Sequence, residues 1–386
     1  MKTIKKYTLL LLIILPFISL RSQTIKGLYV DVFSTIIGNT TKEDSLLNYS
    51  QFNGFNYLAL YDLWPVHVTY DLTNSSTCTV LANFIQKAKQ NFGVLQVGAV
   101  GENFFFFNNV IKIYNQQHTN PLQKFDVYNV EFEFWNTTSV SAGNYYCTTY
   151  LQPSGYSCDT AGAFSYYKKL IHQVDSLATA GGVISETYVG WFNQGQAVTI
   201  ANTVDRILLH DYISNYSSLY SYIKQRLQYI AARNIITDVI PIFSAEPSFM
   251  GPWLSTHNVS TPYNDLQTSL TNETGTWKQY INLKGYQWFA YSFMPYNVTT
   301  GMESKKNNEE VNIFPNPASN YLIINGNISA PLTVEFMNTI GQRIKLDQTR
   351  TVQGVSLDIS LLPSGIYYCT VHSGDLITCK KISILK

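Results

Sequence analysis

The feature that most constrains the fold is a repeated alternation of short apolar segments with longer amphipathic ones. Eight apolar, β-rich segments recur at residues 27–33, 56–63, 94–101, 128–135, 183–190, 206–213, 238–246 and 285–294. Helical patterns lie between them at residues 77–91, 103–118, 160–179, 216–233 and 264–283. Continuous apolar strands that alternate with helices are typical of a parallel sheet that is covered on both faces.

The number of these units favours closure of the sheet into a ring. Eight strands over about 270 residues predict an α/β chain with a (β/α)₈ (TIM) barrel at residues 24–300. The main alternative is an open, doubly wound sheet. The glycine motif of the dinucleotide-binding version of that sheet, G-x-G-x-x-G, does not follow the first segment. We therefore favour the barrel and expect no cofactor.

The N-terminal residues 1–22 have the pattern of a secretory signal peptide. Three lysines precede an apolar run at residues 7–20, and the small residue Ser22 marks the expected cleavage point. No other run is long enough to span a bilayer, so we expect no transmembrane segment in the mature chain. Cleavage would remove four basic residues and leave 22 basic against 25 acidic residues, a net charge of −3. We expect no binding to nucleic acid, because the chain has no basic patch.

The composition changes after residue 300. Residues 301–310 are polar and charged, contain no aromatic residue, and predict a linker. Beyond them, short strand-like segments lie at residues 311–314, 321–325, 332–338, 342–345, 355–359, 365–372 and 376–384. Their close spacing, with turn residues between them, predicts a small C-terminal β-sandwich at residues 311–386.

This C-terminal segment resembles the sorting domain of the type IX secretion system of Bacteroidetes. The matching pieces are F-P-N-P at 314–317 followed by A-S-N-Y-L, N-T-I-G-Q-R-I at 338–344, L-P-S-G-I-Y at 362–367 and K-K-I-S-I at 380–384. The resemblance implies passage through the outer membrane by the type IX machinery, followed by release or attachment to the cell surface. The alternative is an ordinary immunoglobulin-like binding module.

The five cysteines are too few for a disulfide scaffold, but an exported chain can form individual bridges. We expect Cys147 and Cys158 to close one loop. Cys369 and Cys379 are placed symmetrically about an expected turn, so we expect them to face each other across a hairpin. Cys78 is left over. Neither the cysteines nor the histidines have the spacing of metal ligands, and we predict no metal site.

The fourth apolar segment carries acidic residues at regular positions. In F-D-V-Y-N-V-E-F-E-F-W-N at residues 125–136, Asn129, Glu131, Glu133 and Trp135 share one parity. Side chains of a strand alternate between its faces, so these four would point into the barrel together. Two adjacent buried carboxyls raise each other's pKa, and such a carboxyl can act as a general acid at neutral pH. The alternative is an edge strand with one solvated face.

Further polar and aromatic residues fall at the predicted C-terminal ends of the strands, where active sites of such barrels lie. They are Asp31, Tyr61, Asp62, Trp64, Glu186, Tyr188, Trp191, His210, Asp211, Tyr212, Glu246 and Trp253, with Trp288 within the eighth strand. Indole rings pack on the C–H faces of sugars, and carboxylates bind sugar hydroxyls, so this cluster predicts a carbohydrate site. We expect its substrate-binding residues to include Trp135, His210, Asp211, Tyr212, Glu246, Trp253 and Trp288. His210 is expected to be a hydrogen-bonded wall and not a base.

The fourth segment also resembles the D-x-x-D-x-D-x-E motif of glycoside hydrolase family 18, which includes chitinases and endo-β-N-acetylglucosaminidases. The motif positions are Asp126, Asn129, Glu131 and Glu133. The resemblance implies that Glu133 is the general acid and that Glu131 orients the 2-acetamido group of the substrate, which attacks the anomeric carbon. Asp126 and Asn129 would support the pair. The implied partner is a polysaccharide or a glycoprotein glycan, cleaved with retention.

The chain departs from the family pattern at several positions. Glu131 stands where the family has Asp, which adds a methylene where geometry is tight. His210 takes the place of a tyrosine in the strand-six motif, and the strand-three motif is half kept at residues 99–102. One alternative is a retaining clan A glycosidase that uses Glu133 and Glu246, although Phe132 stands where that clan has Asn. The other is a non-catalytic glycan-binding or adhesion protein on a decayed barrel.

Overall fold

The computed structural model describes residues 23–295 and 311–386, with gaps at 327–331, 339–341, 352–353 and 374–375. Two compact units make up the chain, Met1–Thr299 and Thr300–Lys386. The signal peptide predicted at 1–22 and the linker predicted at 301–310 lie outside the described residues. Within the described part, no helix is both long and apolar enough to cross a membrane.

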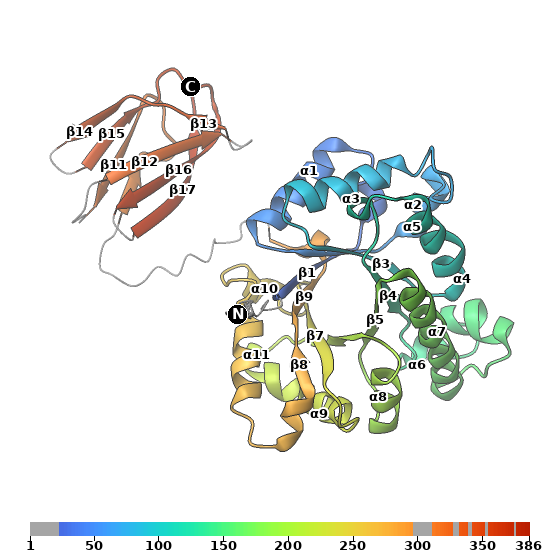
Figure 1. Cartoon of the computed structure of the whole chain (residues 1–386). Helices are drawn as coiled ribbons and strands as arrows, with labels where there is room; N and C mark the ends of the chain where they lie inside the picture. The colour runs from blue at the N-terminus through green and yellow to red at the C-terminus, as the bar shows by residue number, and fades with distance from the viewer. Residues whose placement is uncertain (1–22, 296–310, 327–331, 339–341, 352–353, 374–375) are drawn as a thin grey trace, which may run out of the picture. The chain divides into compact units, whose positions relative to one another are not determined.

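Eight parallel strands close into a ring in the first unit (Figure 1). They are β1 (Ile25–Val30), β2 (Tyr57–Leu60), β3 (Gln96–Gly101), β4 (Val127–Glu131), β5 (Ile184–Val189), β6 (Arg206–His210), β7 (Thr237–Ser244) and β9 (Gly285–Phe289). β9 pairs with both β7 and β1 and so closes the ring. A short strand, β8 (Ile281–Leu283), lies beside β7. The predicted (β/α)₈ barrel is confirmed.

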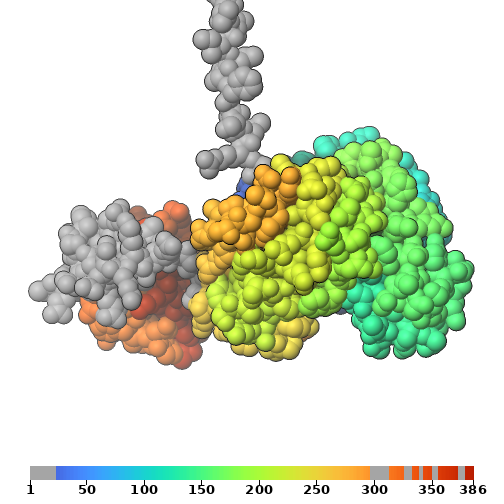
Figure 2. Space-filling model, turned by 90° about the horizontal axis from the view of Figure 1, so that it is seen from below, coloured from blue at the N-terminus to red at the C-terminus, as the bar shows by residue number. Residues whose placement is uncertain are grey.

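Helices cover the outside of this ring. The longer ones are α1 (Thr40–Phe52), α2 (Leu63–Tyr70), α3 (Thr79–Asn91), α7 (Thr160–Gly181), α8 (Gln194–Ala201), α9 (Leu219–Ala231) and α11 (Thr261–Thr271). In Figure 2 the green to orange segments form a continuous surface over one side of the barrel. The helix predicted at 264–283 is wrong in its second half, where a 3₁₀ turn (Thr276–Tyr280) leads into β8.

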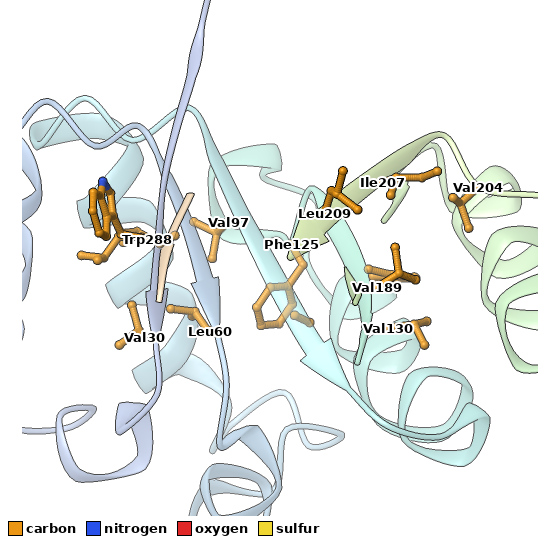
Figure 3. Packing of buried hydrophobic residues seen from close by; sticks show 14 of the residues in the cluster. Val30, Leu60, Val97, Phe125, Val130, Val189, Val204, Ile207, Leu209 and Trp288 are labelled. Carbon is orange, nitrogen blue, oxygen red and sulfur yellow. The ribbon is translucent and has the colours of Figure 1, made fainter. Parts of the chain in front are cut away.

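The strands sort their side chains into two apolar layers. Outward-facing residues, among them Val30, Leu60 and Leu209, pack against the helices (Figure 3). Inward-facing residues such as Val127 and Leu208 fill the ring itself. Both faces of each strand are thus covered by apolar groups, which explains why the strand sequences are apolar at nearly every position.

A polar cluster is buried inside the ring near the N-terminal ends of the strands. The carboxylate of Glu186 accepts hydrogen bonds from Tyr57 Oη and Asn129 Nδ2, and it forms an ion pair with Arg206. Arg206 also donates to Gln96 Oε1 over 3.1 Å. Glu186 is fully buried and Arg206 is 3% exposed. Glu186 therefore belongs to the structural interior and not to the C-terminal end of its strand, where the sequence had placed it.

Glu186→Gln is expected to lower the free energy of unfolding by about 3–5 kcal/mol, because it leaves the buried charge of Arg206 without a counterion. Urea denaturation measures this loss. The double variant Glu186→Gln/Arg206→Met should recover part of it, since no uncompensated charge remains inside the ring.

Glu43→Gln is the matched control for that experiment. Glu43 lies in the first turn of α1, on the outside of the ring, and its Oε1 accepts from Gly38 N. The amide keeps this acceptor, so the control should unfold like the wild type. A Glu186→Gln variant as stable as the control would contradict the assigned role of the ion pair.

The second unit consists of two four-stranded antiparallel sheets. One contains β10 (Val311–Phe314), β11 (Tyr321–Gly326), β15 (Gly354–Asp358) and β14 (Gln348–Thr351). The other contains β13 (Arg343–Ile344), β12 (Leu332–Asn338), β16 (Gly365–Ser373) and β17 (Leu376–Ile384). Buried residues of both sheets, such as Leu357 and Ile382, share one core. The predicted β-sandwich is confirmed.

The cysteines pair only in part as expected. Cys147 and Cys158 form a disulfide. The second expected bridge is not formed, because Cys369 pairs in register with Lys380, and Cys379 pairs with Thr370. An offset of one residue puts the two thiols on opposite faces of the hairpin. Cys369 therefore lies in the core, and Cys379 is exposed.

Labelling of the native protein with a maleimide is expected to modify Cys379 and to spare Cys369 and Cys78. Both of the latter are buried, and burial raises the pKa of the Cys369 thiol to about 12. Denaturation without a reductant should make all three reactive. Peptide mass spectrometry reads the result, and a Cys379 that resists labelling after denaturation would reveal a bridge.

Candidate functional site

Glu131, the last residue of β4, points into the C-terminal mouth of the ring. Tyr29 of β1 donates its hydroxyl hydrogen to Glu131 Oε2. Burial raises the pKa of Glu131 to about 7; the hydrogen bond from Tyr29 opposes this rise, and the charges of Glu133 and Glu102 add to it. A carboxyl with such a pKa populates both protonation states at neutral pH, as a general acid or base must.

β4 ends at Glu131, so the strand predicted to reach Trp135 is too long. Glu133 lies in the turn that follows, and its carboxylate accepts a hydrogen bond from Asn136 Nδ2 over 3.0 Å. Trp135 packs across the mouth on Gly190, where an added Cβ would lie 2.7 Å from the indole. Glu133 is partly buried, and its charge reaches Glu131. The structure thus keeps the two acids together although only one is on the strand.

An aromatic rim surrounds Glu131. The ring of Tyr29 lies 5.7 Å from that of Tyr61 and 5.1 Å from that of Phe289. Tyr212 continues the rim, 5.7 Å from Phe289 and 6.5 Å from Tyr188. These rings limit the access of water to the carboxyl of Glu131, which remains partly exposed, and this loss of hydration is the main source of its raised pKa.

A pocket of about 370 Å³ opens beside this rim, at the ends of β2 and β3 and along the loop after β4. It is called the aromatic pocket below. Its lining is Tyr61, Asp62, Leu63, Trp64, Pro65, Val100, Gly101, Glu102, Asn103, Phe105, Phe106, Tyr145 and Tyr150. Burial raises the pKa of Tyr61, and the charges of Glu131 and Glu102 add to this rise. Tyr61 belongs to both the rim and the pocket, and Tyr29, which donates to Glu131, has its ring 5.7 Å from that of Tyr61, so the pocket lies beside the rim around Glu131.

The sequence identified only part of this pocket. Tyr61, Asp62 and Trp64 were recognised at the end of the second strand. Tyr145 and Tyr150 were missed, because they lie in short helical turns of the long connection between β4 and α7, whose path no periodicity reveals. That loop is tied by the Cys147–Cys158 disulfide, and the spacing of these two cysteines was the available signal.

His210 and Glu246 also face the mouth region. The imidazole of His210 stacks on Tyr212, with ring centres 4.1 Å apart. Burial and the nearby charge of Arg226 lower the pKa of His210 to about 4, so the ring is neutral at pH 7. The carboxylate of Glu246 accepts from Ser244 Oγ over 2.8 Å, and its charge acts on Tyr212. The neutral, stacked histidine is suited to form a wall.

Two predicted site residues lie away from the mouth. Asp126 precedes β4 at the opposite end of the ring, where its carboxylate pairs with Lys89 Nζ at 2.7 Å and accepts from Val97 N at 2.7 Å. Asn129 belongs to the buried polar cluster around Glu186. The structure gives both residues internal partners and removes them from the candidate site.

Three more predicted residues are covered by the protein itself. Trp288 is fully buried on the outer face of β9, where its indole N–H donates to Val259 O over 2.9 Å (Figure 3). Trp253 is stacked between Tyr216 and His257, with ring centres 4.4 and 4.1 Å away, so neither indole face is open to a sugar. Asp211 is fully buried, and burial raises its pKa well above the ordinary value.

No group of three or more histidine, cysteine, aspartate or glutamate side chains within the described ranges is arranged to hold a metal ion. The side chains at the mouth are carboxyls, phenols and indoles, which can transfer protons and pack against apolar faces of a ligand.

Comparison with known proteins identifies the second unit. Residues 312–385 match the family described as secretion system C-terminal sorting domain. The C-terminal unit is a sorting domain. It marks the chain for export to the medium or the cell surface, and it implies handling by the type IX secretion machinery, as the sequence pattern had indicated. A search of curated proteins found no match to the sequence.

Several solved structures are similar to the chain at low identity. A β-glucuronidase from Bacteroides uniformis has a TM-score of 0.45 at 9% identity, covering 94% of this chain and 46% of its own. An FMN-binding β-glucuronidase from Facaelibacterium prausnitzii L2-6 has a TM-score of 0.41 at 6% identity, covering 95% and 57%. A double mutant of the Cellulomonas fimi endo-β-1,4-mannanase has a TM-score of 0.36 at 11% identity, covering 94% of both chains. The chain spans about half the length of the two glucuronidases. Similarity at this level carries no argument about activity.

The stability difference between Glu131→Gln and the wild type is expected to depend on pH. The folded-state pKa of about 7 lies above the ordinary value of 4.5, so between these pH values the unfolded chain releases the Glu131 proton while the folded protein keeps it, and rising pH favours unfolding. The unfolding free energy of the wild type should fall by up to about 3 kcal/mol over this pH range. That of the variant should not show this fall, because glutamine does not titrate. Urea titrations from pH 4.5 to 8 measure the difference, which should grow to pH 7 and then level off.

Proposed function

We propose that the exported barrel unit is a glycoside hydrolase whose substrate lies at the mouth of the ring. The single observation that supports this most is the carboxyl of Glu131, which has a pKa of about 7 and lies beside a second glutamate and the aromatic pocket. A carboxyl of this kind keeps a proton beside Glu133 at neutral pH, as an acid-catalysed cleavage needs, and aromatic walls hold sugar rings.

Glu133 and Glu131 have the two separate roles that the family 18 resemblance implies. Glu133 donates its proton to the leaving glycosidic oxygen while the 2-acetamido oxygen of the substrate attacks the anomeric carbon. Glu131 orients that acetamido group. Water then opens the cyclic intermediate, with Glu133 as the base, and the sugar is released with retained configuration. The charge of Glu133 helps to raise the pKa of Glu131, so Glu131 can hold a proton near neutral pH.

We further propose β-linked N-acetylhexosamine glycans as the substrate, since this mechanism needs a 2-acetamido group. A retaining mechanism with Glu246 as the nucleophile is the alternative within the same reaction class. Its support is the position of Glu246 just beyond the end of β7 and the reach of its charge to Tyr212.

A second candidate function is glycan binding without cleavage. Both acids already have hydrogen-bond partners inside the protein, Tyr29 for Glu131 and Asn136 for Glu133. A carboxyl engaged in this way is less available for proton transfer to a substrate. This observation favours a barrel that retains ligand binding alone.

Cleavage assays with the mature chain separate these functions. Chitooligosaccharides and N-glycans serve as substrates, and mass spectrometry detects the products. Glu133→Gln is expected to lower kcat at least about 100-fold, because the amide has no proton to donate. Glu131→Gln should lower it as well, and Glu43→Gln on the outer helix α1 should not, with circular dichroism confirming the fold of each variant.

The remaining outcomes each decide against part of the proposal. Unchanged cleavage by Glu133→Gln would reject Glu133 as the acid. A loss in Glu246→Gln as large as that in Glu133→Gln would assign the nucleophile to Glu246 and reject substrate assistance. Retention of labelled glycan without any cut by the wild type would establish binding alone.

A further inference from the structure

We propose that the aromatic pocket is a subsite for a sugar ring that carries no negative charge, a neutral or amino sugar, and that it rejects uronic acids. The inference deepens the proposed function and rests on it in one respect, that the ligand of the mouth is a glycan. It concerns binding, so it can be tested on a variant that does not cleave.

The charge of the pocket is the first step of the argument. Of the described residues that line it, the charged ones are Asp62 and Glu102, and both are acidic. Glu131 accepts from Tyr29, whose ring lies 5.7 Å from that of the lining residue Tyr61, and so adds a third carboxyl beside the pocket. A sugar carboxylate or sulfate placed here would meet like charges with no lysine or arginine to offset them, and like-charge contacts select strongly against a ligand.

The hydrogen bonds of Glu102 are the second step. Tyr145 Oη and Tyr150 Oη both donate to the same oxygen, Oε2, over 2.8 Å each. The other oxygen, Oε1, has no hydrogen bond from the described residues, and Glu102 is one of the residues that line the pocket. The two phenols hold the carboxylate in place, and Oε1 is left to accept from a hydroxyl, an amide N–H or an ammonium group.

The aromatic walls are the third step. Trp64 and Phe105 line the pocket and are 50% and 60% exposed, so large apolar faces are left open to solvent. Trp253 and Trp288 offer no such face, because one is stacked on both sides and the other is buried. An exposed indole beside a fixed carboxylate acceptor matches the C–H face and the hydroxyl edge of one pyranose ring.

The backbone at the mouth of the pocket is consistent with a built site. Asp62 has a left-handed conformation with φ of 63°, which a non-glycine residue rarely adopts. Its carboxylate accepts from Ser34 Oγ, which helps to hold it there. Strained residues of this kind concentrate at ligand sites. Asp62 is therefore placed to add a second acceptor next to Glu102.

The test measures binding to the mature chain carrying Glu133→Gln, by calorimetry. The probes are the tetramer of β-linked N-acetylglucosamine, its de-N-acetylated cationic form, and a hyaluronan tetrasaccharide, which alternates N-acetylglucosamine with glucuronic acid. We expect the first two to bind at least about tenfold more tightly than the third. Equal or tighter binding of the hyaluronan probe would overturn the proposal.

Two variants tie the selectivity to the pocket. Trp64→Ala should weaken binding of the neutral tetramer at least about tenfold, whereas Phe52→Ala should not. Phe52 is also exposed, at 62%, but it ends helix α1 on the outside of the ring. Glu102→Gln should reduce the difference in affinity between the neutral and anionic probes, since it removes one repelling charge. An unchanged difference, or equal losses in both aromatic variants, would contradict the subsite.

These outcomes are distinguishable from failure of the proposed hydrolase. If the wild type cuts no glycan but the neutral and cationic probes bind with the expected preference, the subsite stands and the hydrolase falls. If the wild type cuts glycans but Trp64→Ala binds the neutral tetramer like the wild type, the hydrolase stands and the subsite falls.

Discussion

Closure of the ring by β9 is the constraint on which the rest of the barrel depends. This strand pairs in parallel with β7 on one side and β1 on the other, and it must approach β1 closely. Gly285 makes this approach possible, because a Cβ there would lie 1.8 Å from Ile25 O and its φ is 148°. A side chain at this position would therefore clash with the neighbouring backbone. Without this contact the sheet would keep two open edges, and its interior would be exposed to water.

Closure also creates the environment of Glu131. Tyr29 of β1 and Glu131 of β4 are three strands apart along the sheet, and they meet only because the ring brings its far sides together. Below them the interior is filled first by apolar side chains and then by the Glu186–Arg206 pair. The packed interior thus closes the N-terminal side of the mouth, and water reaches the carboxyl of Glu131 from the open C-terminal side. The raised pKa is a property of this arrangement and not of the glutamate itself.

The charge pattern of the mouth connects the acids with the aromatic pocket. Glu131 and Glu102 both act on Tyr61, and phenols hold both carboxylates. The proposed selectivity for uncharged or cationic sugars follows from this composition, and the sorting domain marks the barrel for export to the medium or the cell surface. The candidate site thus lies in the barrel unit, and the signal for export lies in the C-terminal unit of the same chain.

The sequence by itself determined the strands, the alternation of side chains along them and the sorting domain, because periodicity and short motifs are local properties. Alternation correctly put Asn129 and Glu131 inside the ring. Only the tertiary structure decided where β4 ends, which tryptophans are covered and which register the last hairpin adopts. Trp288 was expected inside the mouth but lies on the outer face of β9. Neighbouring residues of a strand point to opposite faces, so an error of one residue reverses the placement. Cys369 and Cys379 were misjudged for the same reason, since pairing register is set by contacts between strands. The whole pocket could not be predicted from the sequence for a different reason. Its walls come from the three connections that follow β2, β3 and β4, and these meet only when the ring is closed.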